Sequence, residues 1–435
     1  MALGGGLFTA QNKVLPGTYI NFISASRASA SLSDRGFAAL PVVLDWGADG
    51  KVFTVTQKEF KEETQKYFGY VYDAAELKKL RDLYAHAKTV YFYRVNTGTK
   101  ASNEYANAKY SGTRGNDIRI VIQDSIEKEN AFDVSTYLDS TRVDLQTVLT
   151  PEELLGNDYV DWKENMQLKA VAGTPLTGGT NKEELTGEDY LAALEALESY
   201  SFNVLICPSK DALIKKLFAS YTKRLRDECG VKFQTVIYDY SGDYHGVVNL
   251  KSKTADADAA EHELVYWTGG ALADCAVNKT LTNTSYDGEY EVDAAAKQAE
   301  LMKSVEAGEF RFHMVGDSVR VLEDINSFVS FTEEMNSDFS LNQVVRVLDQ
   351  YGNDIASLFN NKYLGKIPND ADGRVSLWGD LSTYNKQMQA IRAIQNFNPD
   401  ELQVEPGEDK RSIVVSNPVM PTCAMEKCYM TIYVQ

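Results

Sequence analysis

The side chains that could carry acid–base chemistry are few in this sequence, and they stand far apart. The four histidines are His86, His245, His262 and His313. His86 lies in an apolar helical stretch and His313 alternates within a strand-like stretch. Such residues usually serve packing or the surface. We predict no catalytic residue among them.

The thiols give no clear site either. The five cysteines are Cys207, Cys229, Cys275, Cys423 and Cys428. They are few, odd in number and scattered, so a disulfide framework is not expected and a reducing compartment fits. Cys423 and Cys428 form a C-x4-C pair, but it lacks the second pair or nearby histidine that a zinc site needs. We interpret both as small apolar side chains and predict no metal.

Motifs for phosphate or acyl chemistry are also missing. The sequence holds no G-x-x-x-x-G-K-[ST], so it has no Walker-type phosphate cradle. The GGT at 178–180 lacks a glycine fingerprint, and SGTRGND at 111–117 opens a strand rather than a helix. The G-x-S-x-G elbow of hydrolases is absent. Paired glutamates, such as those at 62–63 and 333–334, fit solvated helix starts and loops. No cofactor is predicted.

Composition narrows the class of protein. The chain has 435 residues, a net charge of −18 and no apolar run long enough to span a bilayer. This length favours two or three domains. The acidic balance argues against direct binding of nucleic acid, which needs a basic surface. The first residues, MALGGGLFTAQNK, lack the basic and apolar regions of a secretion signal.

The elements that would position any site begin with a strand, a helix and a strand. An apolar run at 35–47 predicts a buried strand, 73–88 predicts a helix capped by Asp73, and 89–95 predicts another strand. This order is typical of a parallel βαβ unit. The pattern changes after residue 96, where turns separate short predicted strands at 117–122, 131–138, 142–148 and 168–173. They predict an all-β domain, a sandwich or barrel, inserted into the α/β part.

The α/β pattern resumes after residue 180. Helices are predicted at 187–200, 209–230, about 258–275, 338–360 and 379–397, and strands at 202–208, 231–239, 310–315 and 319–331. Two further short strands are expected around ELQVE and RSIVVS. The last residues, KCYMTIYVQ, alternate as a strand does, although few partners are left for them in the chain.

Four stretches, in this order, resemble the tail sheath proteins of contractile bacteriophages, tailocins and related injection systems. Residues 13–47 are similar to the family's N-terminal arm and first core strand, and 107–122 to the entry of its β-sandwich. TPLTGGTN (174–181) resembles the return to a subtilisin-like α/β domain, and 414–435 resembles the last strands. The similarity is greatest to sheaths of phages of Gram-positive bacteria and their defective relatives.

The resemblance implies a domain plan: an α/β, subtilisin-like core with an inserted all-β sandwich and two extended arms that lend strands. The expected segments are an N-terminal arm (1–23), the first part of the core (24–96), the β-sandwich (97–180), the core (181–335), its C-terminal part with tube-facing helices (336–420) and a C-terminal arm (421–435).

The resemblance also implies a structural role. Each arm would add a strand to a sheet in a neighbouring subunit, and head-to-tail contacts of this kind build open helical polymers. The N-arm strand would be Thr18, Tyr19, Ile20, Asn21 and Phe22, and the C-arm strand Cys428, Tyr429, Met430, Thr431, Ile432, Tyr433 and Val434. The polymer, stacked rings expected to be hexameric, would surround a tail tube and contract from a metastable lattice.

Further partners follow from the same resemblance: the tail tube, baseplate and tail terminator proteins, with no nucleic acid and no membrane. The place would be the virion tail or a tailocin particle, assembled in the cytoplasm of the host bacterium. The family's tube-facing helix is expected at 379–397, with Lys386 and Arg392 free to meet acidic groups on the tube. The alternative interpretation of both charges is an exposed, solubilising surface.

Two other classes stay open on the sequence alone. One is a divergent α/β, subtilisin-like hydrolase with an inserted β domain, which the order of elements permits but the missing nucleophile motif disfavours. The other is a monomeric adhesin or surface-layer module, which the missing secretion signal disfavours.

Overall fold

The computed structural model describes residues 32–164 and 166–434. Within them the chain forms two compact units. The larger unit comprises 33–353, 388–397 and 419–434, and the smaller comprises mainly 354–387 and 398–418. The predicted N-arm strand, Thr18–Phe22, lies outside the described residues.

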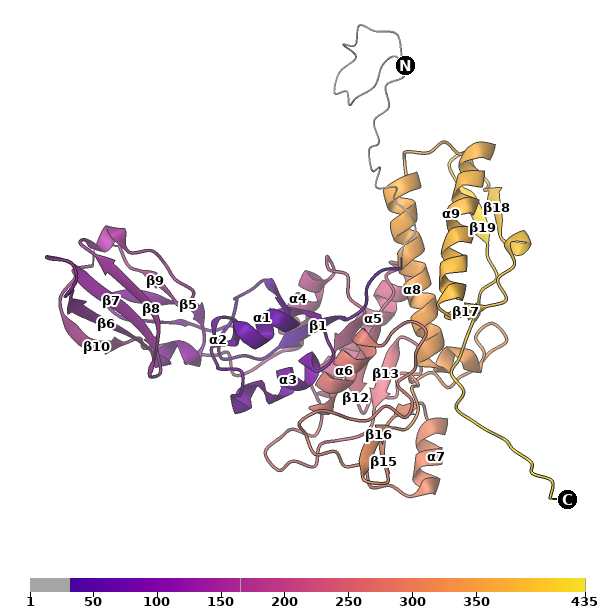
Figure 1. Cartoon of the computed structure of the whole chain (residues 1–435), viewed down its shortest axis with the longest axis horizontal. Coiled ribbons are helices and arrows are strands. Elements are labelled where there is room, and N and C mark those ends of the chain that lie inside the picture. The colour runs from indigo at the N-terminus through magenta and orange to yellow at the C-terminus, as the bar shows by residue number, and fades with distance from the viewer. Residues whose placement is uncertain (1–31, 165, 435) are drawn as a thin grey trace, which may run out of the picture. The chain divides into compact units, whose positions relative to one another are not determined.

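A seven-stranded sheet forms the centre of the larger unit (Figure 1), with the order β14-β13-β12-β11-β1-β3-β2. All neighbouring strands are parallel except β2, which runs antiparallel to β3. The strand bounds are β1 Phe37–Val42, β2 Val52–Thr56, β3 Thr89–Arg94, β11 Val204–Ile206, β12 Gln234–Tyr238, β13 Val247–Leu250 and β14 Glu309–Phe310.

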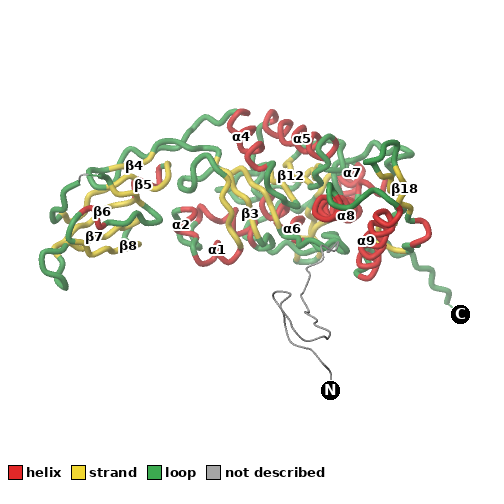
Figure 2. The backbone as a smooth tube through the Cα atoms, turned by 90° about the horizontal axis from the view of Figure 1, so that it is seen from above, coloured by secondary structure: helices red, strands yellow, loops and turns green. Residues whose placement is uncertain are grey.

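Helices cover both faces of this sheet (Figure 2), which is why its strands are apolar on both sides. Ala38 packs with the core of α3 and α6, whereas its neighbour Ala39 packs with the core of α4 and α5. The helix bounds are α1 Gln57–Glu62, α2 Thr64–Phe68, α3 Lys78–Tyr84, α4 Gly187–Leu197, α5 Ala212–Asp227 and α6 Leu264–Asp274. The alternation of strand side chains thus divides the core into two layers.

The predicted βαβ unit is present, since β1 pairs in parallel with β3. The sequence did not predict β2, α1 and α2, which lie between β1 and α3. The cap at Asp73 is wrong: a 3-10 turn at Ala75–Leu77 precedes α3, and its cap position is Ala74, without a side-chain bond. The cap of α5 is Asp211, whose carboxylate accepts from the amides of Leu213 and Ile214.

The inserted region is a β-sandwich, as expected, built from two antiparallel sheets with orders β10-β6-β7-β8 and β4-β5-β9. Isoleucines of β6 and alanines of β5 meet in its own apolar core. The predicted strands correspond to β6, β7, β8 and β10, whereas β4, β5 and β9 were missed. The bounds are β4 Lys100–Ser102, β5 Ala106–Ser111, β6 Ile118–Asp124, β7 Phe132–Leu138, β8 Thr141–Val148, β9 Val160–Trp162 and β10 Val171–Pro175.

The rest of the larger unit is less regular. The strand expected at 319–331 ends at Val321, and 322–331 forms no strand: the Asn326 side chain donates to the Phe339 carbonyl and the Ser327 hydroxyl to the Tyr244 carbonyl. Two small pairs of strands, β15 with β16 and β17 with β20, complete this part. The bounds are α7 Gln298–Glu306, β15 Phe312–Val315, β16 Ser318–Val321, α8 Asn342–Leu358, β17 Ile394–Gln395 and β20 Met420–Pro421.

The smaller unit contains the end of α8, a π-turn at Phe359–Tyr363, most of α9 and a hairpin of β18 and β19. The bounds are α9 Ala371–Ala390, β18 Gln403–Pro406 and β19 Ile413–Ser416. Further 3-10 turns lie at Thr113–Asp117, Pro151–Glu153, Ser337–Ser340 and Pro399–Glu401. In the part of the chain that the structure describes, no helix is long and apolar enough to cross a membrane.

The predicted helix at 379–397 is wrong at both ends. Helix α9 begins eight residues earlier, at Ala371, and ends at Ala390. Its end is fixed by two bonds, from the Arg392 amide to the Gln389 carbonyl and from the Ala393 amide to the Met388 carbonyl, both 2.9 Å. Arg392 has a φ of 61°. These bonds and the left-handed residue form a Schellman-type stop, after which the chain enters β17.

Candidate functional site

The histidines do not form catalytic groups. His86 Nε2 lies 2.9 Å from Asp287 Oδ1, and His262 Nε2 lies 3.0 Å from the Pro208 carbonyl. His245 is enclosed beside Arg226, and burial, with repulsion from that guanidinium, lowers its pKa to about 4. Within 32–164 and 166–434, no serine hydroxyl bonds to a histidine, and no three His, Cys, Asp or Glu side chains gather as a metal site.

Arg94 fills the carboxyl end of β3, where an α/β protein could hold a ligand. Its side chain is buried and donates to the carbonyls of Leu44 (3.0 Å), Gly47 (3.3 Å) and Ser111 (2.7 Å). It also donates to Asn181 Oδ1 at 3.0 Å. Burial lowers the pKa of Arg94, and Asp49 opposes that shift. The guanidinium thus ties the core to β5 of the β-sandwich and to Asn181, where the chain leaves the sandwich.

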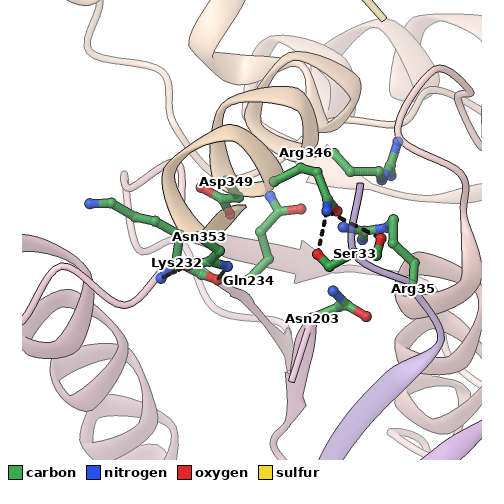
Figure 3. A pocket seen from close by; sticks show the side chains of 9 residues that line it. Ser33, Arg35, Asn203, Lys232, Gln234, Arg346, Asp349 and Asn353 are labelled. Carbon is green, nitrogen blue, oxygen red and sulfur yellow. Dashed lines mark hydrogen bonds between the residues drawn. The ribbon is translucent and has the colours of Figure 1, made fainter. Parts of the chain in front are cut away.

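A small polar cavity lies where the described chain begins (Figure 3). Its volume is about 20 Å³, enough for about one water molecule. The side chain of Gln350, on α8, donates to Ser33 Oγ at 2.5 Å and to the Ser33 carbonyl at 3.2 Å. Arg35 donates to the carbonyls of Leu272 and Cys275 at the end of α6, and burial lowers its pKa to about 9. These contacts hold Ser33 and Arg35, at the start of the described chain, against α8 and α6.

The C-terminal arm is anchored at its own root. β20 pairs with β17, and the Thr422 amide donates to the Ala393 carbonyl at 2.9 Å. The Gln343 side chain, on α8, donates to the Thr422 carbonyl and accepts from the Ala424 amide, both at 3.0 Å. No local pattern indicates this clamp, because it joins residues that are 79 and 81 positions apart in the sequence.

Beyond this clamp the arm pairs with no strand of the described residues. Residues 427–434 form no strand and make no hydrogen bond with any other residue that the structure describes. Figure 1 shows the segment that ends at the C label as an extended trace without an arrow. The exposed fractions of its apolar side chains are 93% for Tyr429, 74% for Met430, 77% for Ile432, 86% for Tyr433 and 95% for Val434. The alternating pattern therefore finds no sheet within the described part of its own chain.

The smaller unit presents a hairpin with two open edges. β18 and β19 pair from Gln403↔Ser416 to Pro406↔Ile413, and no other described strand joins them. Val414 and Val415 are exposed on β19. The hairpin is held to the loop before α9 by Asn369, whose amide donates to the Ser412 carbonyl at 2.8 Å. A two-stranded sheet with unpaired edges is a template for added strands.

The two cations predicted to meet a tube are both exposed. Lys386 lies on α9, but Arg392 lies beyond the helix in the left-handed turn. The prediction that both belong to one helix is therefore wrong. Neither side chain forms an ion pair with a carboxylate of the described residues.

Four family models cover the chain in sequence order. Residues 35–95 match the tail sheath protein Gp18 domain III N-terminal region, and 96–181 match the phage tail sheath protein beta-sandwich domain. Residues 183–327 match the phage tail sheath protein central domain, and 334–435 match the phage tail sheath C-terminal domain.

The chain belongs to the phage tail sheath family. Curated relatives agree with this assignment. The chain is 34% identical to the phage-like element PBSX protein XkdK of Bacillus subtilis, over 99% of both proteins. It is 26% identical to the tail sheath protein of Clostridium phage phiCD119, over 49% of this chain and 60% of that protein.

Solved sheath structures share the fold. The sheath tail protein of Desulfitobacterium hafniense matches with a TM-score of 0.81 and 34% identity, over 94% of this chain and 98% of that one. The sheath tail protein of Listeria innocua matches with a TM-score of 0.80 and 29% identity, over 91% and 94%. The contracted helical sheath of the anti-feeding prophage shares the fold at 11% identity, with a TM-score of 0.57 over 96% and 98%.

The sheath family is one of structural proteins of phage tails and contractile injection systems, not of enzymes. The hydrolase alternative is therefore wrong, in agreement with the missing nucleophile. The mixed α/β fold with an inserted β-sandwich is that of the sheath structures.

Proposed function

We propose that this protein is the repeating subunit of a contractile sheath, a helical homopolymer held together by strands that the subunits lend to one another. The observation that carries this proposal is the C-terminal arm. Residues 428–434 have the pattern of a strand, yet they are exposed and unpaired among the described residues of their own chain. Such a segment aggregates unless a partner covers it.

The energetics favour a partner strand. A lent strand gains main-chain hydrogen bonds along its length, while alternate side chains gain burial. Burial of Met430, Ile432 and Val434 would contribute about 1.5–3 kcal/mol for each side chain. Part of this gain offsets the entropy lost when a free arm is ordered.

The hairpin of β18 and β19 supplies the acceptor on the neighbouring subunit. Its edges are open among the described residues, and its exposed valines lack a covering layer. An added strand would turn a marginal two-stranded sheet into a sheet of three or more strands, which is the size that is stable in water. The N-arm strand, Thr18–Phe22, would add to the same inter-subunit sheet.

The polymer would be open rather than closed, since donor and acceptor are different surfaces and head-to-tail contacts do not close on themselves. We propose stacked, hexameric rings around a tail tube, with baseplate and tail terminator proteins at the two ends. Lys386 and Arg392 would face acidic groups of the tube. The similarity to contracted sheaths supports this arrangement at the level of fold alone.

Contraction would release energy stored at assembly. The subunits would first form an extended, metastable lattice, and a trigger at the baseplate would let rigid domains rotate into a wider and shorter one. The extended state would persist because a kinetic barrier separates it from the contracted state. Its lifetime would therefore be set by the rate of crossing that barrier. The arms would keep subunits linked during the change, and the shortening sheath would drive the tube through the target envelope.

Two finer expectations belong to the same proposal. The seven-stranded, mostly parallel sheet with helices on both faces supports a subtilisin-like core that has no catalytic residues. The particle would be a virion tail or a tailocin, assembled in the cytoplasm of its host, without direct contact with nucleic acid or membrane.

Deletion of residues 425–435 tests the proposal. We expect the monomer's thermal transition to change little, because these side chains are not buried in their own chain. Hollow, striated cylinders seen by negative-stain electron microscopy should disappear. Deletion of residues 1–23 should have the same effect.

A matched pair of point variants sharpens this test. Ile432→Asp places a charge inside the lent strand and should abolish cylinders, whereas Met425→Asp, at a fully exposed position before that strand, should leave them. Cylinders that form without residues 425–435, or a truncated monomer that cannot fold, would contradict the strand-lending account.

A further inference from the structure

The smaller unit contains a second cavity that the proposed function does not use. It has a volume of about 110 Å³, and its walls are mainly apolar. Leu377, on α9, and Tyr363, in the π-turn, are buried at its base, while Leu364 and Ile367 are largely exposed on its rim. The volume is close to that of cavities that hold an aromatic ring.

The cavity lies next to the hairpin edge. Ile413, the first residue of β19, lines it, and so does Arg411 in the turn before that strand. The wall is firm: Asn369 bonds to the Ser412 carbonyl at 2.8 Å, and Arg374 donates to Asn369 Oδ1 at 2.9 Å. A strand added to β19 would therefore pass the mouth of a preformed apolar pocket.

Two arginines give the pocket a positive rim. Neither Arg374 nor Arg411 forms an ion pair with a described carboxylate, although the chain carries a net charge of −18. Unpaired arginines beside an apolar hollow suit a ligand that joins an apolar side chain to a carboxylate.

The C-terminal arm combines a carboxylate with apolar side chains, whereas the N-terminal arm has no carboxylate. Residues 1–33 contain Lys13 and Arg27 and no acidic residue, so the arginines would repel them. Residues 422–434 contain one carboxylate, Glu426; Lys427 follows it, and the run from Cys428 to Val434 is then apolar except for Thr431. Among the described residues of its own chain, Glu426 makes a 3.5 Å contact with Thr280 Oγ1 and stands near the half-buried carboxylate of Glu323.

We propose that this cavity is the docking site for the C-terminal arm of a second copy of the chain, with Glu426 of that copy paired to Arg411 and Arg374 and one apolar side chain after it entering the pocket. The inference rests on the proposed function, and it adds which arm docks at this end of the hairpin and which contacts select it. Charge at the rim would reject the N-terminal arm and set the register of the C-terminal one.

A charge swap tests the pairing in the full-length chain. Arg411→Glu and Glu426→Arg, each alone, should raise the critical concentration for cylinder assembly at least tenfold, about 1.4 kcal/mol. The chain with both changes should assemble within about threefold of the natural protein, because each copy is both donor and acceptor. Lys216→Glu, the same charge change at an exposed position of α5, serves as the matched control and should have little effect.

A cross-link tests the placement. Cys428 is exposed and free, and Leu364→Cys puts a thiol on the rim; Cys229→Ser and Cys423→Ser remove the other exposed thiols. Diamide, an azo oxidant that takes up the two hydrogens, should then join assembled subunits through a disulfide and give a ladder on a non-reducing gel. Leu213→Cys, at an exposed position far along the sequence, should give none.

The outcomes separate this inference from the proposed function. Two chains, one with Cys428 alone and one with the rim cysteine alone, should cross-link when mixed; a disulfide formed only within one chain would overturn docking in a second copy. Normal assembly of both single charge variants, with no ladder, would overturn the pocket and leave the sheath intact. If a variant forms no cylinders, fluorescent peptide 422–434 should bind the full-length natural chain, and Arg411→Glu should abolish that binding.

Discussion

Arg94 shows how one side chain fixes the junction between the α/β core and the inserted β-sandwich. Its guanidinium bonds to carbonyls on the core side, at Leu44 and Gly47, and on the sandwich side, at Ser111. A buried guanidinium is stable only when its donors are met, and here they bond to backbone oxygens, to the Asn181 side chain and to one carboxylate oxygen of Asp49 at 3.3 Å. The cost of breaking this arrangement should be large.

Arg94→Met should therefore lower the free energy of unfolding by about 3 kcal/mol, since it leaves buried carbonyls without a donor. Arg142→Met, at an exposed position of β8, should change it by less than about 0.5 kcal/mol. Hydrogen exchange should also become faster at the amides of Thr99 and Thr180. These two residues bond to each other where the chain enters and leaves the β-sandwich. Unchanged exchange there would show that the junction does not depend on Arg94.

His245 makes the free energy of unfolding depend on pH. Burial, with repulsion from Arg226, lowers its pKa from the ordinary 6.5 to about 4. The unfolded chain therefore binds the proton more readily than the folded one. The stability that follows is complete above pH 6.5 and is lost as the pH falls toward 4.

Between pH 7 and pH 4.5, His245 should lower the free energy of unfolding by about 2 kcal/mol. His245→Gln should flatten this part of the curve, which denaturant unfolding at a series of pH values would measure. His313→Gln, on β15 and less enclosed, is a control that should change the slope less. An identical slope for the natural chain and His245→Gln would refute the assignment.

At the scale of elements, the β-sandwich has a core of its own. Its apolar cluster is formed by residues of its own strands and loops, with Trp46 as a contribution from the core. An element with its own core can be exchanged without disturbing the parent fold. The C-terminal arm and the β18–β19 hairpin, in contrast, lack partner strands among the described residues.

Replacement of residues 97–180 by a short Gly/Ser linker should therefore leave cylinder assembly largely intact. Some loss of monomer stability is expected, because Arg94 would lose its acceptor at Ser111. Electron microscopy would detect the cylinders, and circular dichroism would check that the core stays folded. A folded core that no longer assembles would place the sandwich in the lattice contacts.

At the scale of the whole molecule, charge opposes assembly. Each subunit carries a net charge of −18, so stacking subunits brings like charges together. Apolar burial and main-chain bonds at the arms would have to exceed this repulsion. Salt screens the repulsion far more than it weakens those contacts.

Assembly should consequently be easier at higher ionic strength. Between about 10 mM and 150 mM NaCl the Debye length falls from about 30 Å to about 8 Å. The critical concentration for cylinders, measured by sedimentation, should fall over this range. The chain without residues 425–435 should not sediment at either concentration. A critical concentration that rises with salt would mean that attraction between charges, rather than apolar burial, dominates the lattice.

Patterns in the amino-acid sequence are sufficient to assign the class of this protein. The features that assign it are local or compositional, and such features can be recognised without coordinates. They are the order of strand and helix patterns, the short strands between 97 and 180, the missing nucleophile motif and the alternating last residues. Periodicity fixed most elements of the core, because each face of the main sheet is buried and the side chains must match it.

Only the tertiary structure decided how distant segments meet. Three features depend on contacts between residues far apart in the sequence: the Gln343 clamp on the C-terminal arm, the Arg94 junction and the arginine-rimmed cavity. The Schellman stop that removes Arg392 from α9 is local, but it is seen only in the backbone geometry. No local pattern encodes such contacts, because a polar side chain or a chain reversal is stable only where the folded chain supplies its partners. The same reason makes the arm recognisable as a strand from its sequence, while its lack of a partner among the described residues is visible only in the fold.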